Sequence, residues 1–237
     1  VTKIFEEATL LGELAEPRQG LATADNDRFL RMWFEPTINN IGFGFGNASD
    51  AEKSGKKWFP YNKGGEYRKY YGNQEYVVNW AENGKEIKSF CFPNGARRSV
   101  IRSENTYFRS CVSWSKISAG NLALRYYPNG FLYDVAGCSI FAEDEKAKEY
   151  FLAVMNGNLA KSLFRIMSPT MNFEVGAISM FPILNLDKFS NHNYSIIKSC
   201  ISISRLDWDS RETSWDFKTP PLLLDYTAEN PNPEQGT

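Results

Sequence analysis

The sequence has few of the residues on which metal and nucleophile chemistry usually depends. His192 is the only histidine, which excludes multi-histidine metal centres and H-E-x-x-H sites, and its polar neighbours favour a position in a loop. The four cysteines, Cys91, Cys111, Cys138 and Cys200, are irregularly spaced and form no C-x-x-C pair. We therefore expect buried free thiols in a reducing compartment, with a zinc site built from four separated cysteines as the alternative.

Long apolar runs and several signature motifs are also absent. No run of about 18 apolar residues occurs, which excludes a transmembrane helix and leads us to expect no membrane partner. The chain begins at Val1 without a charged-then-apolar export segment, so we expect a cytoplasmic protein that is a piece of something longer. A P-loop and a G-x-S-x-G motif are missing, and no spacing of Asp and Glu singles out an acid–base pair. The sequence therefore predicts no catalytic residue, no metal and no cofactor in this chain.

What the chain does contain is enough apolar surface for a core. Its 237 residues are 42% hydrophobic and 15% aromatic, which favours one folded domain over a disordered chain. We expect a single α+β domain, rich in β-structure and with packed helices, over residues 1–217. We also expect a lead-in helix over about residues 2–14, which Pro17 ends. An extended tail is expected over residues 218–237.

Hydrophobic periodicity and turn residues predict the elements in between. Residues 144–167 carry an apolar stripe of helical spacing that breaks at 156–158, and residues 195–206 form a helix or a strand. A loop is expected at 38–55, and a short strand or loop at 178–183. We expect strands at 29–34, 58–61, 75–80, 122–127, 131–135 and 139–141. Turn signals occur at Asn83-Gly84, where we expect a tight hairpin turn, at Pro93-Asn94-Gly95, and at Pro128-Asn129-Gly130, where we expect a turn between two paired strands.

The charges are distributed unevenly along the chain. The whole sequence has 27 Lys and Arg against 28 Asp and Glu, a net charge of −1. Residues 53–125 alone have 14 Lys and Arg, five Glu and no Asp, which leaves +9 there and −10 in the remainder. Basic side chains interleaved with aromatic residues and glycine turns suit a phosphate backbone. The alternative is a solvated face without a partner, because proximity in sequence does not establish one patch in space.

Residues 42–46 form a glycine-rich run. Residues 42–46, Gly-Phe-Gly-Phe-Gly, superficially match the F-x-G-x-G loop of some adenosylmethionine-binding domains. Such a loop needs a preceding hydrophobic strand and a following helix, and neither flank predicts one. We therefore expect a glycine loop without a cofactor.

Several longer blocks carry a resemblance to a known family. Residues 20–31, GLATADNDRFLR, are similar to the G-L-x-T-x-x-N-D-R-F-L-R start of certain DNA-methyltransferase specificity domains. Further blocks follow in the same order at residues 57–73, 77–80, 98–102, 114–118, 124–131, 134–141 and 207–217. As a set they resemble the target-recognition region of PglX-type adenine-specific DNA methyltransferases of BREX phage-defence systems, and more distantly TaqI-type specificity domains. The resemblance covers about residues 18–217.

The resemblance implies a mixed α/β domain that reads bases in the major groove, while a separate domain flips out the adenine. Methyl transfer in the family needs an N-P-P-Y tetrapeptide and an S-adenosylmethionine loop. Here Asn-Pro occurs only at Asn230-Pro231 and Asn232-Pro233, without the second proline and the tyrosine. We therefore expect the chain itself to be no enzyme, whereas the parent protein would be a site-specific N6-adenine DNA methyltransferase that uses S-adenosylmethionine.

The expected partners are double-stranded DNA and the methyltransferase domain of the same parent chain. The candidate DNA contacts are basic residues of the central segment: Lys63, Arg68, Lys69, Arg97, Arg98, Arg102, Lys116 and Arg125. Trp58, Trp80 and Trp114 are expected in the core. Two other functions remain open. One is a protein-interaction module that docks the methyltransferase or a DNA-mimicking phage protein. The other is a carbohydrate-binding module.

Overall fold

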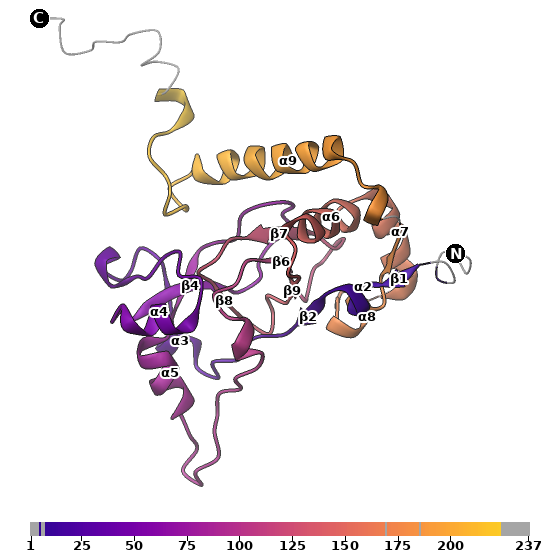
Figure 1. The fold of residues 1–237 in the computed structure, drawn as a ribbon. Coiled ribbons are helices and arrows are strands. Elements are labelled where there is room, and N and C mark those ends of the chain that lie inside the picture. Colours follow the sequence, from indigo (N-terminus) through magenta and orange to yellow (C-terminus); the bar gives the residue numbers. More distant parts are fainter. Residues whose placement is uncertain (1–4, 6–7, 169, 185, 224–237) are drawn as a thin grey trace, which may run out of the picture.

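Four short strands form an antiparallel sheet near the centre of the fold (Figure 1). The computed structural model describes residue 5 and residues 8–168, 170–184 and 186–223. The strand order is β2-β9-β6-β7. Their bounds are β2 Glu16–Arg18, β9 Ser139–Phe141, β6 Cys111–Trp114 and β7 Leu124–Tyr127. Pro17, expected to end a helix, instead pairs with Ile140 in the edge strand β2, a position that tolerates the missing N–H of proline.

The two faces of this first sheet are both covered. Successive side chains of a strand point to opposite faces, so Val112 and Ile140 join one apolar cluster while Cys111 and Phe141 join another. The first cluster packs against helices and the second against another sheet. The sequence predicted two of these strands, β7 and β9, and did not predict β6 or β2.

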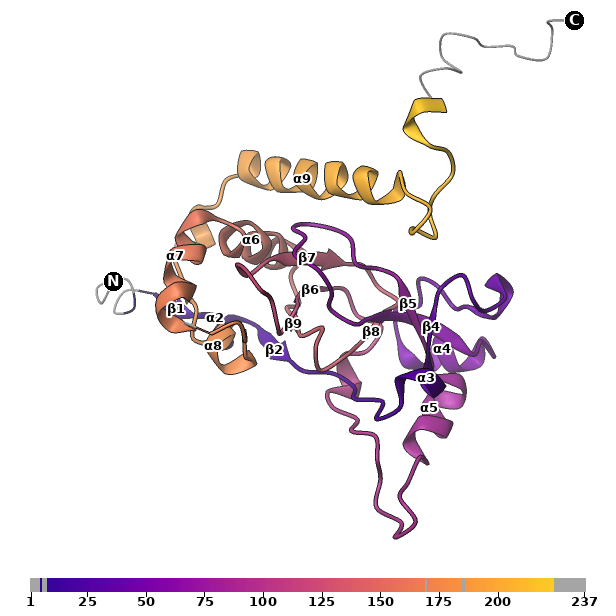
Figure 2. The same ribbon diagram turned by 180° about the vertical axis from the view of Figure 1, so that it is seen from behind.

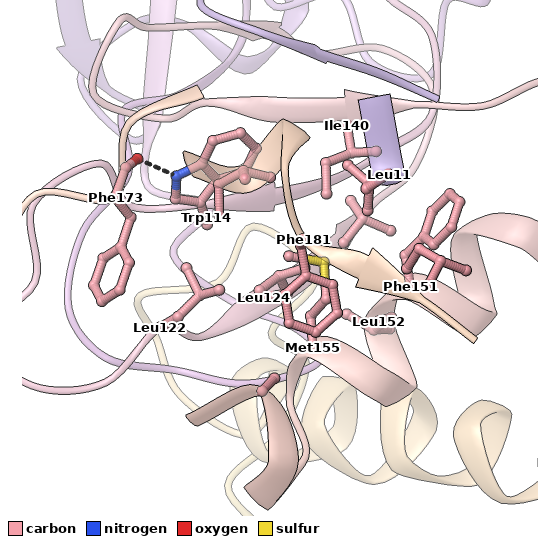
Figure 3. Close-up of a cluster of buried hydrophobic side chains, with 14 of the residues drawn as sticks. Leu11, Trp114, Leu122, Leu124, Ile140, Phe151, Leu152, Met155, Phe173 and Phe181 are labelled. Carbon is pink, nitrogen blue, oxygen red and sulfur yellow. Dashed lines mark hydrogen bonds between the residues drawn. The ribbon is translucent and has the colours of Figure 1, made fainter. Parts of the chain in front are cut away.

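The helical side of the first sheet is formed mainly by α6 (Glu145–Met155) and α7 (Asn158–Met167). The Asp144 side chain accepts a hydrogen bond from the backbone N–H of Lys146 and so caps α6. Between the helices, the Asn156 side chain bonds both backbone groups of Leu124, which explains the predicted break. Figure 3 shows this core, in which the Trp114 indole N–H donates to the carbonyl of Phe173 at 2.8 Å.

A second sheet, with the order β3-β5-β4-β8, lies on the other side. Its β4–β8 pair is parallel and its other pairs are antiparallel. The strands are β3 Leu30–Met32, β5 Tyr76–Asn79, β4 Trp58–Asn62 and β8 Leu132–Tyr133. Short helices surround this sheet: α3 Asn26–Phe29, α4 Ala48–Lys53, α5 Ala81–Lys88, and the 3-10 turns Ile38–Asn40 and Glu104–Thr106. Because α4 lies within residues 38–55, the expected loop there is only partly correct.

Two predicted hairpin turns are wrong. Asn83 and Gly84 have positive φ angles of 54° and 74°, as a tight turn requires, but they lie at the start of α5 rather than between paired strands. The turn at residues 128–130 connects β7 to β8, and these strands belong to different sheets. The turn residues correctly predict where the chain bends. They do not predict which strands pair, because pairing depends on contacts between residues distant in sequence.

The N-terminal helix prediction over about residues 2–14 is only partly correct. Thr9–Leu10 form the strand β1, which pairs with β10 (Pro182–Ile183), whereas Leu11–Leu14 form the helix α2. Residues 1–4 and 6–7 of the predicted helix lie outside the described residues. Residues 178–183, expected as strand or loop, are divided between α8 (Val175–Ser179) and β10.

A long helix, α9 (Asn191–Asp209), follows the 3-10 turn Leu186–Lys188 and packs against α6 (Figures 1 and 2). His192 therefore lies in the first turn of a helix and not in a loop. The side chain of Ser190 accepts from the N–H of Asn193 and caps α9. An extended tail was predicted over residues 218–237. Most of it, residues 224–237, lies outside the described residues.

The architecture confirms the predicted α+β class. Trp58, Trp80 and Trp114 are 9%, 2% and 0% exposed, which confirms them as core residues. All four cysteines are free thiols; Cys111 and Cys138 are buried as expected, whereas Cys91 is exposed. In the described part of the chain, no helix has both the length and the apolar character to cross a bilayer.

Candidate nucleic-acid interface

The fold pairs many of the central cations with acids from the flanking segments. Four such ion pairs occur among the described residues: Lys63–Asp134, Arg68–Asp207, Arg109–Glu143 and Lys116–Glu174. Each of these carboxylates lies outside residues 53–125. The charge asymmetry along the sequence is therefore partly cancelled in space. The eight candidate residues differ in their burial and in the protein groups that they already contact.

Lys63 serves a buried carboxylate. Its Nζ lies 2.6 Å from Oδ2 of Asp134, a side chain that is only 3% exposed. The same Oδ2 accepts from the Tyr61 hydroxyl at 2.8 Å, and Oδ1 accepts from the N–H of Ala136. Burial and the neighbouring carboxylate raise the pKa of Tyr61 well above its usual value, so the phenol keeps the proton that it donates. These contacts tie β4 to the turn after β8 and give Lys63 a structural role.

Three further candidates are partly engaged at the surface. Arg68 lies 3.1 Å from Asp207 and its guanidinium stacks on the Trp208 ring, 5.1 Å from the centroid. Lys69 donates to the carbonyl of Asn156 at 2.6 Å. Lys116 lies 3.0 Å from Glu174. Exposed pairs of this kind contribute about 0–1 kcal/mol, so Arg68 and Lys116 can exchange their partner for a phosphate at small cost.

Arg125 is not at the surface. It is 0% exposed; its Nη1 donates to the carbonyl of Arg68 and its Nη2 to Oγ of Ser115. Its Nε has no hydrogen-bond partner among the described residues. The structure thus removes Arg125 from the possible DNA contacts, because β7 turns its side chain inward. A charge count along the sequence could not distinguish it from the exposed cations.

The remaining candidates share one projecting segment, residues 89–103, which we call the basic hairpin. Figures 1 and 2 both show the chain between α5 and β6 extending well beyond the two sheets. Residues 91–98 are all exposed. The segment contains Arg97, Arg98 and Arg102 and no Asp or Glu, a net charge of +3.

Backbone hydrogen bonds give the basic hairpin its shape. Phe92 donates to Ala96 at 2.8 Å, Arg98 donates to Phe90 at 2.9 Å, and Gly95 closes the turn by donating to Phe92 at 2.9 Å. Pro93 suits the second position of such a turn, and Gly95 has a φ of +83° that favours glycine. This confirms the predicted turn at residues 93–95.

The base of the hairpin is anchored to the domain. Val100 and Ala22 exchange two backbone hydrogen bonds, at 2.8 and 2.9 Å. The Ser99 hydroxyl donates to the carbonyl of Ile87 at 2.6 Å, and the Tyr107 hydroxyl donates to that of Arg102 at 2.8 Å. The three arginines are therefore carried on a fixed stem and not on an unattached loop.

None of the three arginines forms an ion pair with a described residue. The guanidinium of Arg102 donates from Nη1 to Oε1 of Gln19, at 3.4 Å. Arg98 stacks on two phenylalanine rings, 4.4 Å from the centroid of Phe90 and 5.1 Å from that of Phe92. Lys88 and Glu104 neutralise each other at the foot of the hairpin. The projecting part therefore presents unbalanced positive charge.

Sequence reasoning missed the residues that support these arginines. Arg28 stacks between Phe29 and Phe90, 5.1 and 5.0 Å from their centroids, and pairs with Glu86 at 2.8 Å. Arg28 lies outside residues 53–125, so counting the charges of that segment could not include it. The sequence does show two phenylalanines, Phe90 and Phe92, shortly before Arg97 and Arg98, but this pattern gives no indication of Arg28.

The glycine run at residues 42–46 forms a loop, as expected. A 3-10 turn precedes it and the six-residue α4 follows it, which is not the strand–loop–helix arrangement of an adenosylmethionine loop. Among the residues that the structure describes, no group of three or more His, Cys, Asp and Glu side chains could hold a metal ion.

Comparison with known proteins identifies two relatives. The chain is 39% identical over 229 residues to the adenine-specific methyltransferase PglX of Lacticaseibacillus casei strain Zhang, a match that covers 94% of this chain and 18% of that protein. It is 35% identical over 200 residues to the adenine-specific methyltransferase BrxX of Escherichia coli O9:H4 strain HS, covering 83% of this chain and 15% of that protein. The chain matches no protein-family profile. It is thus homologous to a segment of these methyltransferases and spans less than a fifth of their length.

Proposed function

We propose that this chain is the double-stranded DNA recognition module of a site-specific N6-adenine DNA methyltransferase of the phage-defence type. The homology to segments of PglX and BrxX supports this proposal, since both are adenine-specific methyltransferases. Methyl transfer and S-adenosylmethionine binding would belong to a different part of the same polypeptide, acting in the cytoplasm. This chain would contribute the choice of DNA site.

The observation that carries the proposal is the basic hairpin. It projects from the fold, holds three arginines on a hydrogen-bonded stem, and has no acidic residue of its own. Guanidinium groups bind phosphates and the guanine edge in bidentate fashion. We assign Arg97 and Arg102 to direct DNA contact, because neither is stacked on a ring or paired with an acid among the described residues.

The other exposed candidates would contribute secondary contacts. Arg68, Lys69 and Lys116 each keep one polar protein partner, so a phosphate would compete with that partner for the cation. We expect their substitution to weaken binding less than that of Arg97. Lys63 has a structural role at Asp134, and Arg125 is no longer part of the proposed interface.

The test is fluorescence anisotropy of the chain on a mixed-sequence duplex over a series of salt concentrations. Binding with a steep loss of affinity as salt rises is expected, and each lost phosphate contact should reduce the slope of log K against log salt by about 0.9. Arg97→Ala should lower both affinity and slope. Arg165→Ala is the matched control, because Arg165 is an exposed arginine on α7, away from the hairpin. Absence of binding even at low salt would refute the proposal, as would equal effects of the two substitutions.

A second candidate function is contact with the catalytic part of the same polypeptide, and the outer face of α9 favours it. Ile196, Ile203 and Leu206 are 46%, 67% and 69% exposed and lie one or two helical turns apart. Exposed apolar side chains that share a helix face are typical of a protein contact. Co-purification of a separately expressed catalytic segment with this chain should be lost in Ile203→Asp. Retention of the complex would contradict this assignment. The same assay with a DNA-mimicking phage protein should instead depend on Arg97.

A further inference from the structure

The tip of the basic hairpin carries a large apolar side chain beside its arginines. Phe92 is 49% exposed and lies at the first position of the turn closed by Gly95. Pro93 follows it, so the first half of the four-residue turn is apolar, and Arg97 and Arg98 follow the turn. The tip of the basic hairpin thus presents an exposed aromatic ring next to positive charge.

The Phe92 ring is held in place by a stack that begins in the core. Phe29 is fully buried and contacts Phe90 edge to face, with ring centroids 5.3 Å apart. Arg28 caps both of these rings. Arg98 then lies over Phe90 on one side and Phe92 on the other.

Alternating rings and guanidinium groups thus extend from the core toward the tip. Each cation–ring contact contributes about 0.5–1 kcal/mol at an exposed site, which is enough to favour one orientation of the Phe92 ring. The ring would therefore reach a ligand already ordered, with little further loss of side-chain freedom on binding.

We infer that Phe92 is a wedge that inserts between adjacent base pairs of bound duplex DNA and unstacks them. Phenylalanine and proline are among the side chains that proteins insert into base steps, and flanking arginines hold the phosphates on either side. In this arrangement Arg97 would hold the backbone, whereas Arg98 would act as a positioning residue that supports the wedge. The inference rests on the proposed DNA-binding function and adds a distortion of the duplex to it.

Phe92 could instead contact an apolar protein surface, but the charges around Phe92 fit such a partner less well. The basic hairpin carries three cations and no carboxylate, and a protein interface centred on it would need to supply the counter-charges. Duplex DNA supplies phosphates and stacked planar bases together. The neighbouring charges therefore favour DNA.

The experiment ligates a nicked plasmid in the presence of the chain and measures the linking number after the protein is removed. Insertion of a ring at many sites unwinds the duplex, so the wild-type chain should lower the linking number in proportion to the amount bound. Phe92→Ala should abolish this shift and weaken anisotropy binding about ten-fold, since stacking on one base contributes about 1–3 kcal/mol. The salt slope should stay unchanged, because no phosphate contact is lost. Phe92→Trp, which keeps a ring, should retain the shift.

Two variants separate the wedge from the proposed function. Phe34→Ala is the matched control: Phe34 is 61% exposed and lies outside the hairpin, and its loss should change neither readout. Arg98→Lys keeps the charge but not the planar stack, and should reduce the linking-number shift more than the affinity. If the wild-type chain binds DNA with a salt slope but Phe92→Ala unwinds the plasmid equally, the wedge is refuted and DNA binding stands. If the wild-type chain binds no DNA, both are refuted.

Discussion

Lys63 gives the sharpest contrast between a structural cation and a DNA contact. In the substitution Lys63→Met, the carboxylate of Asp134 stays buried at 3% exposure and loses its cation, which lies 2.6 Å away in the native chain. Leaving one partner of a fully buried pair uncompensated costs about 3–5 kcal/mol. Because Lys63 itself is 28% exposed and water can reach the pair, we expect a smaller decrease in the free energy of unfolding, about 2–3 kcal/mol.

This loss is measurable by urea unfolding and by the thermal midpoint. For a chain of this size, about 2–3 kcal/mol corresponds to a decrease in Tm of about 4–12 °C. Lys161→Met, at an exposed lysine on α7 without an ion pair among the described residues, should change neither quantity. Adding Asp134→Asn to Lys63→Met should recover part of the loss, because the double variant buries no unpaired charge. If Lys63→Met unfolds like the wild type but loses DNA affinity and salt slope, the structural role that we assign to Lys63 is refuted.

Three other predictions concern the core, the backbone and the thiols. Trp114→Ala, which removes a fully buried indole and its bond to Phe173, should cost about 3–5 kcal/mol in urea unfolding; a loss below about 1 kcal/mol would contradict the packing in Figure 3. Gly20→Ala places a Cβ 1.9 Å from the carbonyl oxygen of Tyr133, so we expect a strong loss of folded protein by near-UV circular dichroism, and a native spectrum would refute this. Burial raises the pKa of Cys111 and of Cys138 to about 12 in the folded chain, above the usual value near 9. The unfolded chain then releases protons first, so stability should fall as pH rises from about 9 to about 12, and a Cys111→Ala, Cys138→Ala double variant should show a smaller fall in urea unfolding.

The sequence predicted those features of the fold that depend on local or two-sided patterns. The aromatic and β-branched runs of β4, β5 and β7 lie in strands because these strands are buried on one or both faces, and the apolar stripe of residues 144–167 folds as α6 and α7. The helix predicted over about residues 2–14 is interrupted at Thr9 and Leu10, because these two residues pair with Ile183 and Pro182, about 170 residues away, a contact that no local pattern records.

The candidate interface was predicted in composition but not in geometry. Counting charge identified the segment that contains Arg97, Arg98 and Arg102, and the turn residues at 93–95 were correct. It could not show that Arg125 points inward or that Asp134 neutralises Lys63, since both depend on side-chain direction and on contacts between distant segments. The stack from Phe29 to Phe92 depends on the same kind of information.

The central claim is that the basic hairpin lies against DNA, and Cys91 offers a direct measurement of it. Cys91 is exposed within the hairpin, Cys200 on α9 is half-buried, and Cys111 and Cys138 are buried. Maleimide labelling followed by peptide mass spectrometry gives the rate at each thiol with and without saturating duplex. The account predicts that DNA slows labelling of Cys91 several-fold and leaves Cys200 unchanged. Labelling of Cys91 at the same rate with DNA bound would contradict it.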